Sequence, residues 1–175
     1  MPPPLVTAVL VAAISVVVSV AGCGETETAI AEEDAIVQRV ADGDSLVLRG
    51  GARVRLLQID APELGEGECY GRDALRGLAR MLQPGDVVVL EADPRLDRVD
   101  RYERLLRYVH SASTNVNVEL VRRGVATPFF RRGERGRHAD ALLDAADDAR
   151  GERRGLWGAC HVSWEPHRQV ETHFR

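Results

Sequence analysis

The sequence predicts an α+β domain that is predominantly β, a five-stranded Greek-key barrel with about three helices. Five short runs of apolar and β-branched residues lie between turn signals, which is typical of strands in a small barrel. A stretch with helical spacing separates the third run from the fourth, and two more such stretches follow the fifth. This order of elements is that of the OB-type barrel, a fold that carries many unrelated functions.

The first three strands are predicted to form a meander. Asp42-Gly43 is a tight-turn signal between the first strand and the second, and Gly50-Gly51 is the corresponding signal between the second and the third. The later strands are separated from this meander by a helix. In chain order, the five strands are predicted at residues 35–41, 45–49, 53–59, 86–92 and 104–110.

Three helices are predicted from apolar residues that recur every three or four positions. Pro84-Gly85 follows the first of them and Gly124 the second, and these residues are common just after a helix ends. His138 opens the third helix, and we expect it to be solvated rather than a ligand. The predicted helices cover residues 72–82, 117–123 and 137–150.

The N-terminus is predicted to be an export leader, separate from the fold. Residues 5–21 carry no charge and run directly into Gly22-Cys23. This pattern resembles the bacterial lipoprotein signal, in which the cysteine is lipidated and becomes the new N-terminus. Cys23 is therefore the expected lipidation site. An uncleaved membrane anchor and ordinary secretion are the alternatives, because the apolar run has nearly the length that spans a bilayer.

These assignments divide the chain into four parts and place the folded domain outside the cytoplasm, either anchored to the cell membrane or secreted. The parts are a leader at 1–22, an acidic tether at 23–34, the domain at 35–160 and a C-terminal tail at 161–175. Cys69 and Cys160 remain as an even pair, which in an oxidising compartment predicts a disulfide. Two unpaired or buried thiols are the alternative.

Charge limits the ways in which this chain can bind a polyanion. The formal net charge is −4, but the tether supplies much of it: between residues 35 and 160, 21 arginines face 20 acidic residues. A strongly basic nucleic-acid binder would carry a larger excess of positive charge. Binding of a nucleic acid would therefore depend on local arginines and not on net charge.

Acidic residues gather at the ends of predicted strands. Asp42 and Asp44 flank the glycine of the first turn, and Asp60 and Glu63 follow the third strand. Hard divalent cations bind several oxygen ligands, commonly carboxylates, so these residues are candidate metal ligands. The alternatives are a solvated hairpin turn and a polar loop opening, which are common uses of the same residues.

Arg55 lies within an apolar run of the third strand. Its neighbours along the strand are apolar on both faces, so its guanidinium must reach the rim of the barrel or pair with an anion. One interpretation is a structural ion pair, with Asp60 as a candidate partner. The other is bidentate binding of a phosphate beside a metal ion, to which the guanidinium geometry is suited.

An ordered series of motifs resembles the staphylococcal nuclease (thermonuclease) family and covers residues 35–160. The resemblance implies an enzyme with the fold predicted above, and the leader places it outside the cytoplasm. The series consists of Asp42-Gly43-Asp44-Ser45, Arg55-Leu56-Leu57-Gln58-Ile59-Asp60-Ala61-Pro62-Glu63, Tyr70-Gly71, Asp100-Arg101-Tyr102-Glu103-Arg104-Leu105, Glu119-Leu120-Val121-Arg122-Arg123-Gly124 and Gly155-Leu156-Trp157.

The resemblance also implies a cofactor, Ca²⁺, and a role for individual residues. Asp44, Asp60 and the backbone carbonyl of Ala61 match the calcium ligands, and Asp42 matches an acid just outside them. Glu63 matches the proposed general base. The remaining matches concern the substrate: Arg55 and Arg104 hold the scissile phosphate, Tyr102 lies at a terminal phosphate, and Phe130 replaces a tyrosine near the nucleotide.

The expected activity is that of a calcium-dependent phosphodiesterase, a monomer that cuts DNA and RNA, preferably single-stranded or unwound, and leaves 3′-phosphate ends. The alternative is a non-catalytic OB-fold module that binds nucleic acid or a protein. Glu103 favours the alternative, because it replaces the glycine expected before Arg104 and adds a negative charge beside a phosphate site. The intact set of five acidic and basic site residues favours the enzyme.

Overall fold

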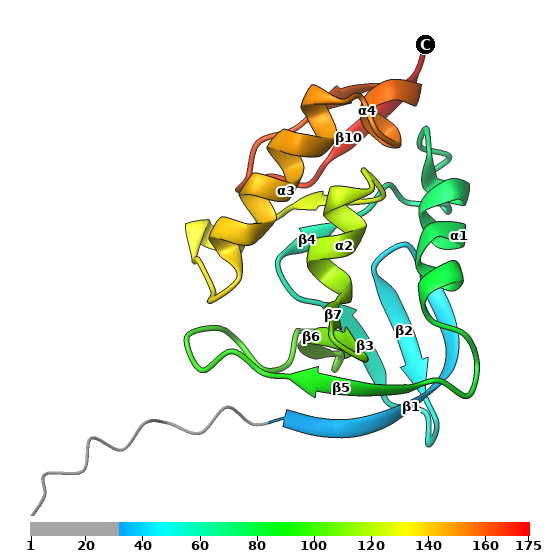
Figure 1. Cartoon of the computed structure of the whole chain (residues 1–175), viewed down its shortest axis with the longest axis vertical. Helices are drawn as coiled ribbons and strands as arrows, with labels where there is room; N and C mark the ends of the chain where they lie inside the picture. The colour runs from blue at the N-terminus through cyan, green and yellow to red at the C-terminus, as the bar shows by residue number, and fades with distance from the viewer. Residues whose placement is uncertain (1–31) are drawn as a thin grey trace, which may run out of the picture.

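The computed structural model describes residues 32–175, and its central feature is a closed five-stranded barrel (Figure 1). The strand order is β3-β2-β1-β5-β6, and a parallel pairing of β3 with β6 closes the barrel. The predicted OB-type barrel is confirmed. Its strands are β1 (Glu32–Asp42), β2 (Ser45–Leu48), β3 (Arg53–Leu56), β5 (Val87–Glu91) and β6 (Leu105–Ser111).

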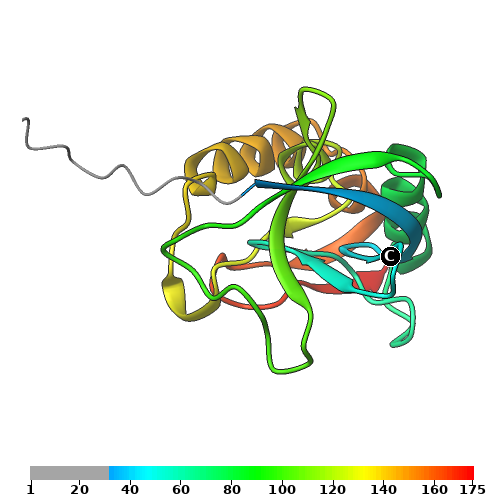
Figure 2. The same ribbon diagram turned by 90° about the horizontal axis from the view of Figure 1, so that it is seen from below.

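Strand β1 belongs to both halves of the barrel. Residues 32–36 pair with β5, whereas Val37 to Asp42 pair with β2, with register shifts between Val37 and Arg39 and again before Asp42. Figure 2 shows β1 running beside β5 and then curving away. The strand begins at Glu32, earlier than predicted, because backbone pairing with β5 continues through acidic residues whose side chains are exposed.

The predicted third strand is interrupted at Leu57-Gln58. Gln58 adopts a left-handed conformation with φ of 57°, which no strand tolerates. Its side chain stabilises the turn: Nε2 donates to the Glu134 carbonyl at 2.7 Å, and Oε1 accepts from the Tyr108 hydroxyl at 2.8 Å. Beyond the turn, β4 (Ile59–Asp60) leaves the barrel and pairs with β8 (Thr127–Pro128).

Helices cover the barrel on several sides and complete its core. The three predicted helices are present as α1 (Gly71–Met81), α2 (Val116–Arg122) and α3 (Ala139–Gly151). Each contributes a fully buried leucine to one hydrophobic core: Leu78, Leu120 and Leu142. The shorter elements are β7 (Thr114–Asn115), the 3₁₀ turn η1 (Arg131–Gly133) and the one-turn helix α4 (Leu156–Ala159).

The predicted C-terminal tail at 161–175 contains most of a β-hairpin. Strand β9 (Cys160–Ser163) pairs with β10 (Glu171–Phe174). The expected disulfide is confirmed between Cys69 and Cys160, and the Thr172 hydroxyl donates to the Cys69 carbonyl at 2.7 Å. The hairpin is therefore tied to the loop that precedes α1.

The predicted leader, the lipidation site Cys23 and most of the tether lie outside the described residues. Within residues 32–175, no helix combines the length and the apolar character that crossing a membrane requires.

Candidate active site

Arg55 joins the two acids that the resemblance assigned to the metal. One terminal nitrogen of its guanidinium lies 2.9 Å from Asp44 Oδ2 and 2.9 Å from Asp60 Oδ1. The other nitrogen donates to the backbone carbonyls of Leu56 and Ile59, at 3.0 and 2.7 Å. The turn at Gln58 makes this possible, because it folds the chain back so that Asp60 faces Arg55. The ion pair with Asp60, one of the two interpretations of Arg55, is present in the structure.

Backbone N–H groups and one hydroxyl hold the two carboxylates in place. Asp44 accepts hydrogen bonds from the Ala61 N–H at 3.1 Å and from the Ser45 hydroxyl at 2.9 Å. Asp60 accepts one from the Val170 N–H at 2.9 Å. The side chains of Asp44 and Asp60 are only 5% and 4% exposed, so they are oriented before any ligand arrives.

Asp60 lies in an environment that disfavours its charge. Burial raises the pKa of Asp60 to about 6, against the effect of Arg55, and the nearby charge of Asp44 adds to the increase. A carboxylate in such a place gains from any further positive charge that approaches it. This is what a cation-binding position requires.

The pKa of Glu63 is shifted more strongly than that of Asp60. Burial, a hydrogen bond to Asp42 and the charges of Asp42 and Asp44 raise the pKa of Glu63 to about 8. Its backbone N–H donates to Glu68 at 2.7 Å, so further negative charge lies in the same loop. Without a cation, Glu63 is therefore largely protonated at neutral pH.

The donor set around Arg55 fits a hard divalent cation. Asp42, Asp44, Asp60 and Glu63 offer carboxylate oxygen alone, and Ala61 follows Asp60 directly in the chain. Burial is the largest cause of the raised pKa values of Asp60 and Glu63, and neighbouring carboxylates add to it. A bound dication would favour the ionised form of both side chains.

Arg104 is positioned by a separate turn between β5 and β6. Asp100 accepts from the Arg104 Nε at 2.7 Å, and also from the backbone N–H groups of Tyr102 and Arg104. Within this turn Glu103 has φ of 61°, a left-handed conformation that glycine adopts more readily. The ring of Tyr102 is exposed, and the guanidinium carbons of Arg101 and Arg104 lie 4.7 and 5.4 Å from its centroid.

A cleft of about 510 Å³ brings the predicted residues of the substrate site together. Arg55, Glu63, Tyr102 and Arg104 all line it. The carbonyl oxygen of Tyr102 also accepts a hydrogen bond from the Arg53 guanidinium, which links the Arg104 turn to β3. Two turns from distant parts of the sequence therefore form one cleft.

Phe130 lies elsewhere than the resemblance implied. Its side chain is buried in the hydrophobic core, with the residue only 4% exposed, so its ring presents no face to a nucleotide. The neighbouring Phe129 lines the cleft in its place. The reason is the chain direction after β8, where consecutive residues alternate between core and cleft.

Sequence reasoning missed several residues that the cleft contains. Arg131, Glu134 and Gln169 line it, and Val170 supports Asp60 from behind. Arg131 lies in a charge-rich segment that a basic-cluster search would find. Gln169 and Val170 belong to the C-terminal segment, which shows no periodicity that would have indicated its position.

The chain was compared with known protein families and with curated proteins. Residues 53–159 match the model of the family described as staphylococcal nuclease homologue. Protein ParB of Escherichia coli is 37% identical over 139 residues, which are 72% of this chain and 73% of that protein. A micrococcal nuclease of Shigella flexneri is 35% identical over 134 residues, 69% of this chain and 71% of its own length.

A third relative, an uncharacterized endonuclease of Haemophilus influenzae, is 31% identical over 127 residues, 69% of this chain and 64% of that protein. The matched region begins at the first residue of β3 and ends at the last residue of α4, so it contains Arg55, Asp60, Glu63 and Arg104. From this match and these relatives, the chain belongs to the staphylococcal nuclease homologue family.

Proposed function

We propose that this protein is a calcium-dependent nuclease that hydrolyses the phosphodiester bonds of DNA and RNA and leaves 3′-phosphate ends. The observation that carries the proposal is the convergence of Arg55, Glu63 and Arg104 on one cleft, next to the buried pair Asp44 and Asp60. The nuclease names of two relatives in the same family support it.

Asp44, Asp60 and the Ala61 carbonyl would hold the calcium ion, with Asp42 just outside. When bound, calcium neutralises phosphate charge and binds the substrate next to the attacking water. Asp44 and Asp60 are already oriented by Ala61, Ser45 and Val170. The Arg55 guanidinium contacts both carboxylates and would have to release them to bind the phosphate. The all-oxygen donor set favours calcium over softer metals.

Glu63 accepts a proton from the attacking water, or orients that water, at the wall of the cleft. The water oxygen attacks phosphorus, and the bond from phosphorus to the 5′-oxygen breaks. The departing oxygen takes up a proton from solvent and becomes a 5′-hydroxyl, and Glu63 returns the proton that it accepted to solvent. The phosphate therefore stays on the 3′ end.

Arg55 and Arg104 donate to the phosphate oxygens as the phosphorus becomes five-coordinate. Their charge interacts more strongly with the transition state than with the substrate, which is what accelerates the reaction. Asp100 fixes the Arg104 side chain through Nε, and this side chain, which is 27% exposed, lines the cleft. Tyr102 is exposed at the cleft, where it can contact a terminal phosphate. The cleft is open enough to take a single strand of nucleic acid.

The test is cleavage of a fluorescent single-stranded DNA by the full chain, with calcium and with a calcium chelator. We expect the wild type to cleave the DNA with calcium and not with the chelator. In Glu63→Gln we expect the rate with calcium to be lower by about 10²–10⁴-fold. Glu66→Gln, at an exposed position of the same loop, is the matched control. Cleavage that survives both the chelator and Glu63→Gln would rule out this mechanism.

A non-catalytic binding module is the second candidate, because Glu103 places a negative charge beside Arg104. Fluorescence anisotropy of the same DNA separates the two. Binding of DNA without cleavage by the wild type in calcium would establish the module and exclude the enzyme.

We also propose that the domain acts outside the cytoplasm, held at the membrane through Cys23 or secreted. The disulfide between Cys69 and Cys160 supports an oxidising compartment. Mass spectrometry of the protein from its native host tests the anchor. A mature N-terminus at lipid-modified Cys23 is the expected result, and an unmodified cytoplasmic chain would contradict the proposal.

A further inference from the structure

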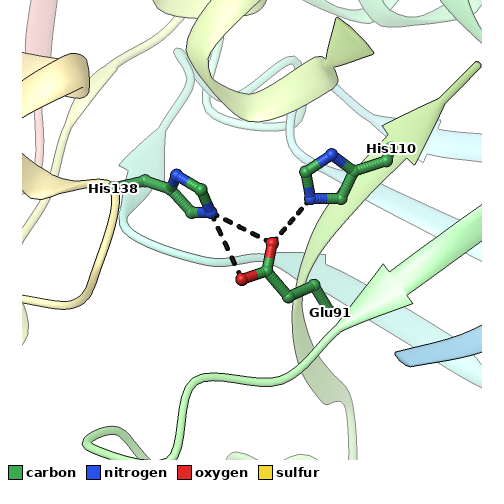
Figure 3. Close-up of side chains that lie close together, drawn as sticks. All are labelled: Glu91, His110 and His138. Atoms are coloured by element: carbon green, nitrogen blue, oxygen red, sulfur yellow. Dashed lines mark hydrogen bonds and ion pairs between the residues drawn. The ribbon is translucent and has the colours of Figure 1, made fainter. Parts of the chain in front are cut away.

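A second cluster of possible ligands lies outside the cleft and joins three distant parts of the chain. Glu91 is the last residue of β5, His110 lies in β6, and His138 immediately precedes α3. Figure 3 shows both imidazole rings pointing at the Glu91 carboxylate. The lining of the cleft within residues 32–175 includes none of the three.

The barrel and the third helix together create this geometry. In the register of β5 with β6, Glu91 lies opposite Tyr108, so His110 is its diagonal neighbour on the same face of the sheet. His138 reaches the same point from the start of α3, and its ring packs edge-on against Tyr108 with centroids 4.5 Å apart. The expectation that His138 is merely solvated is therefore wrong.

The distances are close to those that a metal ion requires. His110 Nε2 lies 2.6 Å and His138 Nε2 lies 3.0 Å from the same oxygen, Glu91 Oε2. One donor atom from each of the three residues falls within 4.8 Å of the others. Two atoms bound to zinc at 2.0–2.1 Å in a tetrahedron lie roughly 3.3 Å apart, so small side-chain movements would form the site.

We propose that Glu91, His110 and His138 bind a first-row transition-metal dication, zinc above all. Two imidazoles with one carboxylate are ligands that zinc prefers, whereas calcium and magnesium prefer oxygen alone. Glu91 is 4% exposed, but His110 and His138 are 24% and 27% exposed, so an ion can enter from solvent and keep a water as its fourth ligand.

Arg137 is the positive group that already contacts this carboxylate. Its guanidinium lies 2.9 Å from Glu91 Oε1, the oxygen that His110 does not contact. A metal on Oε2 leaves that ion pair intact, and Arg137 then orients the carboxylate as a neighbour of a ligand commonly does.

This site is independent of the proposed nuclease activity and predicts a structural effect. A metal bound here would connect β5 and β6 to the start of α3, and it would stabilise only the folded chain. We therefore expect zinc to raise the melting temperature, with calcium unable to replace it.

The experiment is isothermal titration calorimetry of the full chain with Zn²⁺ in the presence of excess calcium, together with thermal unfolding. Every protein carries Cys23→Ser, so that this thiol cannot supply a ligand. We expect one zinc ion per chain, a melting temperature higher by several degrees, and affinity lower by at least about tenfold in His110→Gln and in His138→Gln. His161→Gln, at an exposed position of β9, is the matched control.

Two results would overturn the proposal: no zinc binding by the parent protein, or binding that survives in the double variant of His110 and His138. Cobalt decides the matter if the variants do not fold. Co²⁺ bound to the parent protein should show the intense visible absorption of a four-coordinate site, whereas the weak spectrum of hydrated Co²⁺ would refute it.

Discussion

At the scale of single residues, Glu63 shows how the environment of a carboxyl group can set its protonation. The pKa of Glu63 is raised from 4.5 to about 8, so its ionised form is less favourable in the folded protein than in the unfolded chain. The folded state therefore holds a proton that the unfolded state releases. The contribution of Glu63 to stability is fully present below its pKa in the unfolded chain. It is lost as pH rises through its pKa in the folded protein.

We therefore predict that metal-free wild type loses stability relative to Glu63→Gln as pH rises from about 5 to about 8. Glutamine has no proton to release, so the difference in free energy of unfolding between the two proteins isolates Glu63. Thermal unfolding in chelator across this pH range measures it, with Glu66→Gln as control. Parallel curves for wild type and Glu63→Gln would refute the assigned environment of Glu63.

Glu103 carries two separable costs, a left-handed backbone and a charge beside Arg104. We predict that Glu103→Gly raises the free energy of unfolding by about 0.5–1 kcal/mol, because glycine accepts φ of 61° without a Cβ clash. Glu103→Ala keeps the Cβ and should not stabilise. Both substitutions should tighten binding of an oligonucleotide, since both remove the negative charge.

Urea denaturation and fluorescence anisotropy measure the two effects. Equal stability changes in the glycine and alanine variants would show that backbone conformation is not what Glu103 costs.

At the scale of elements, the turn between β1 and β2 that carries Asp44 is packed closely against helix α1. A Cβ on Gly43 would lie 2.8 Å from the Cβ atoms of both Ala61 and Ala74. There is thus no room for a side chain at Gly43, where the turn between β1 and β2 packs against helix α1 and the residue that follows β4. Gly43 is needed for this close approach rather than for a positive φ.

We predict that Gly43→Ala lowers the free energy of unfolding by about 1–3 kcal/mol, because the added methyl group separates these three elements. Displacement of Asp44 from Asp60 should weaken calcium binding as well. Gly65→Ala is the matched control, since nothing lies within 4 Å of its added Cβ. Urea denaturation and calcium titration of both variants provide the measurement, and equal effects in the two would contradict this account.

The elements that sequence reasoning located are those with a strong local signal. The barrel strands and the three main helices follow from alternation, helical spacing and turn residues, and each lies within a few residues of its expected place. The break at Gln58 was missed because its partners, Tyr108 and Glu134, come from far along the chain. The β9–β10 hairpin was missed because its short, polar strands carry no pattern.

The candidate site was predictable to the same degree and for the same reason. Arg55, Asp60 and Glu63 lie within nine residues of one another, so a local motif reveals them. After β8, the fold determines which side chains point into the core and which point into the cleft. The local sequence around Phe130 does not contain that information. The cluster of Glu91, His110 and His138 was invisible because three separate elements supply it.

At the scale of the whole molecule, one covalent bond connects the region before α1 to the C-terminal hairpin. The disulfide joins cysteines 91 residues apart. Cross-linking so long a segment lowers the entropy of the unfolded chain and stabilises the folded one. It also holds the hairpin near the residues that support Asp60.

We predict that replacing both Cys69 and Cys160 with serine lowers the free energy of unfolding by about 2–5 kcal/mol. A reducing agent should destabilise the wild type by a similar amount and leave the double variant unaffected, which controls for effects of the substitutions themselves. Urea denaturation measures both. A loss that reductant does not reproduce would show that the bond contributes little.

The hydrogen bond from Val170 to Asp60 spans 110 residues, and this has a consequence for the order in which the protein is made. Synthesis proceeds from the N-terminus, so Asp44, Arg55 and Asp60 leave the ribosome before the backbone group of Val170 that fixes Asp60. For the proposed nuclease, the acid cluster is therefore completed only after residue 170 has been made, and a shorter growing chain lacks the group that orients Asp60.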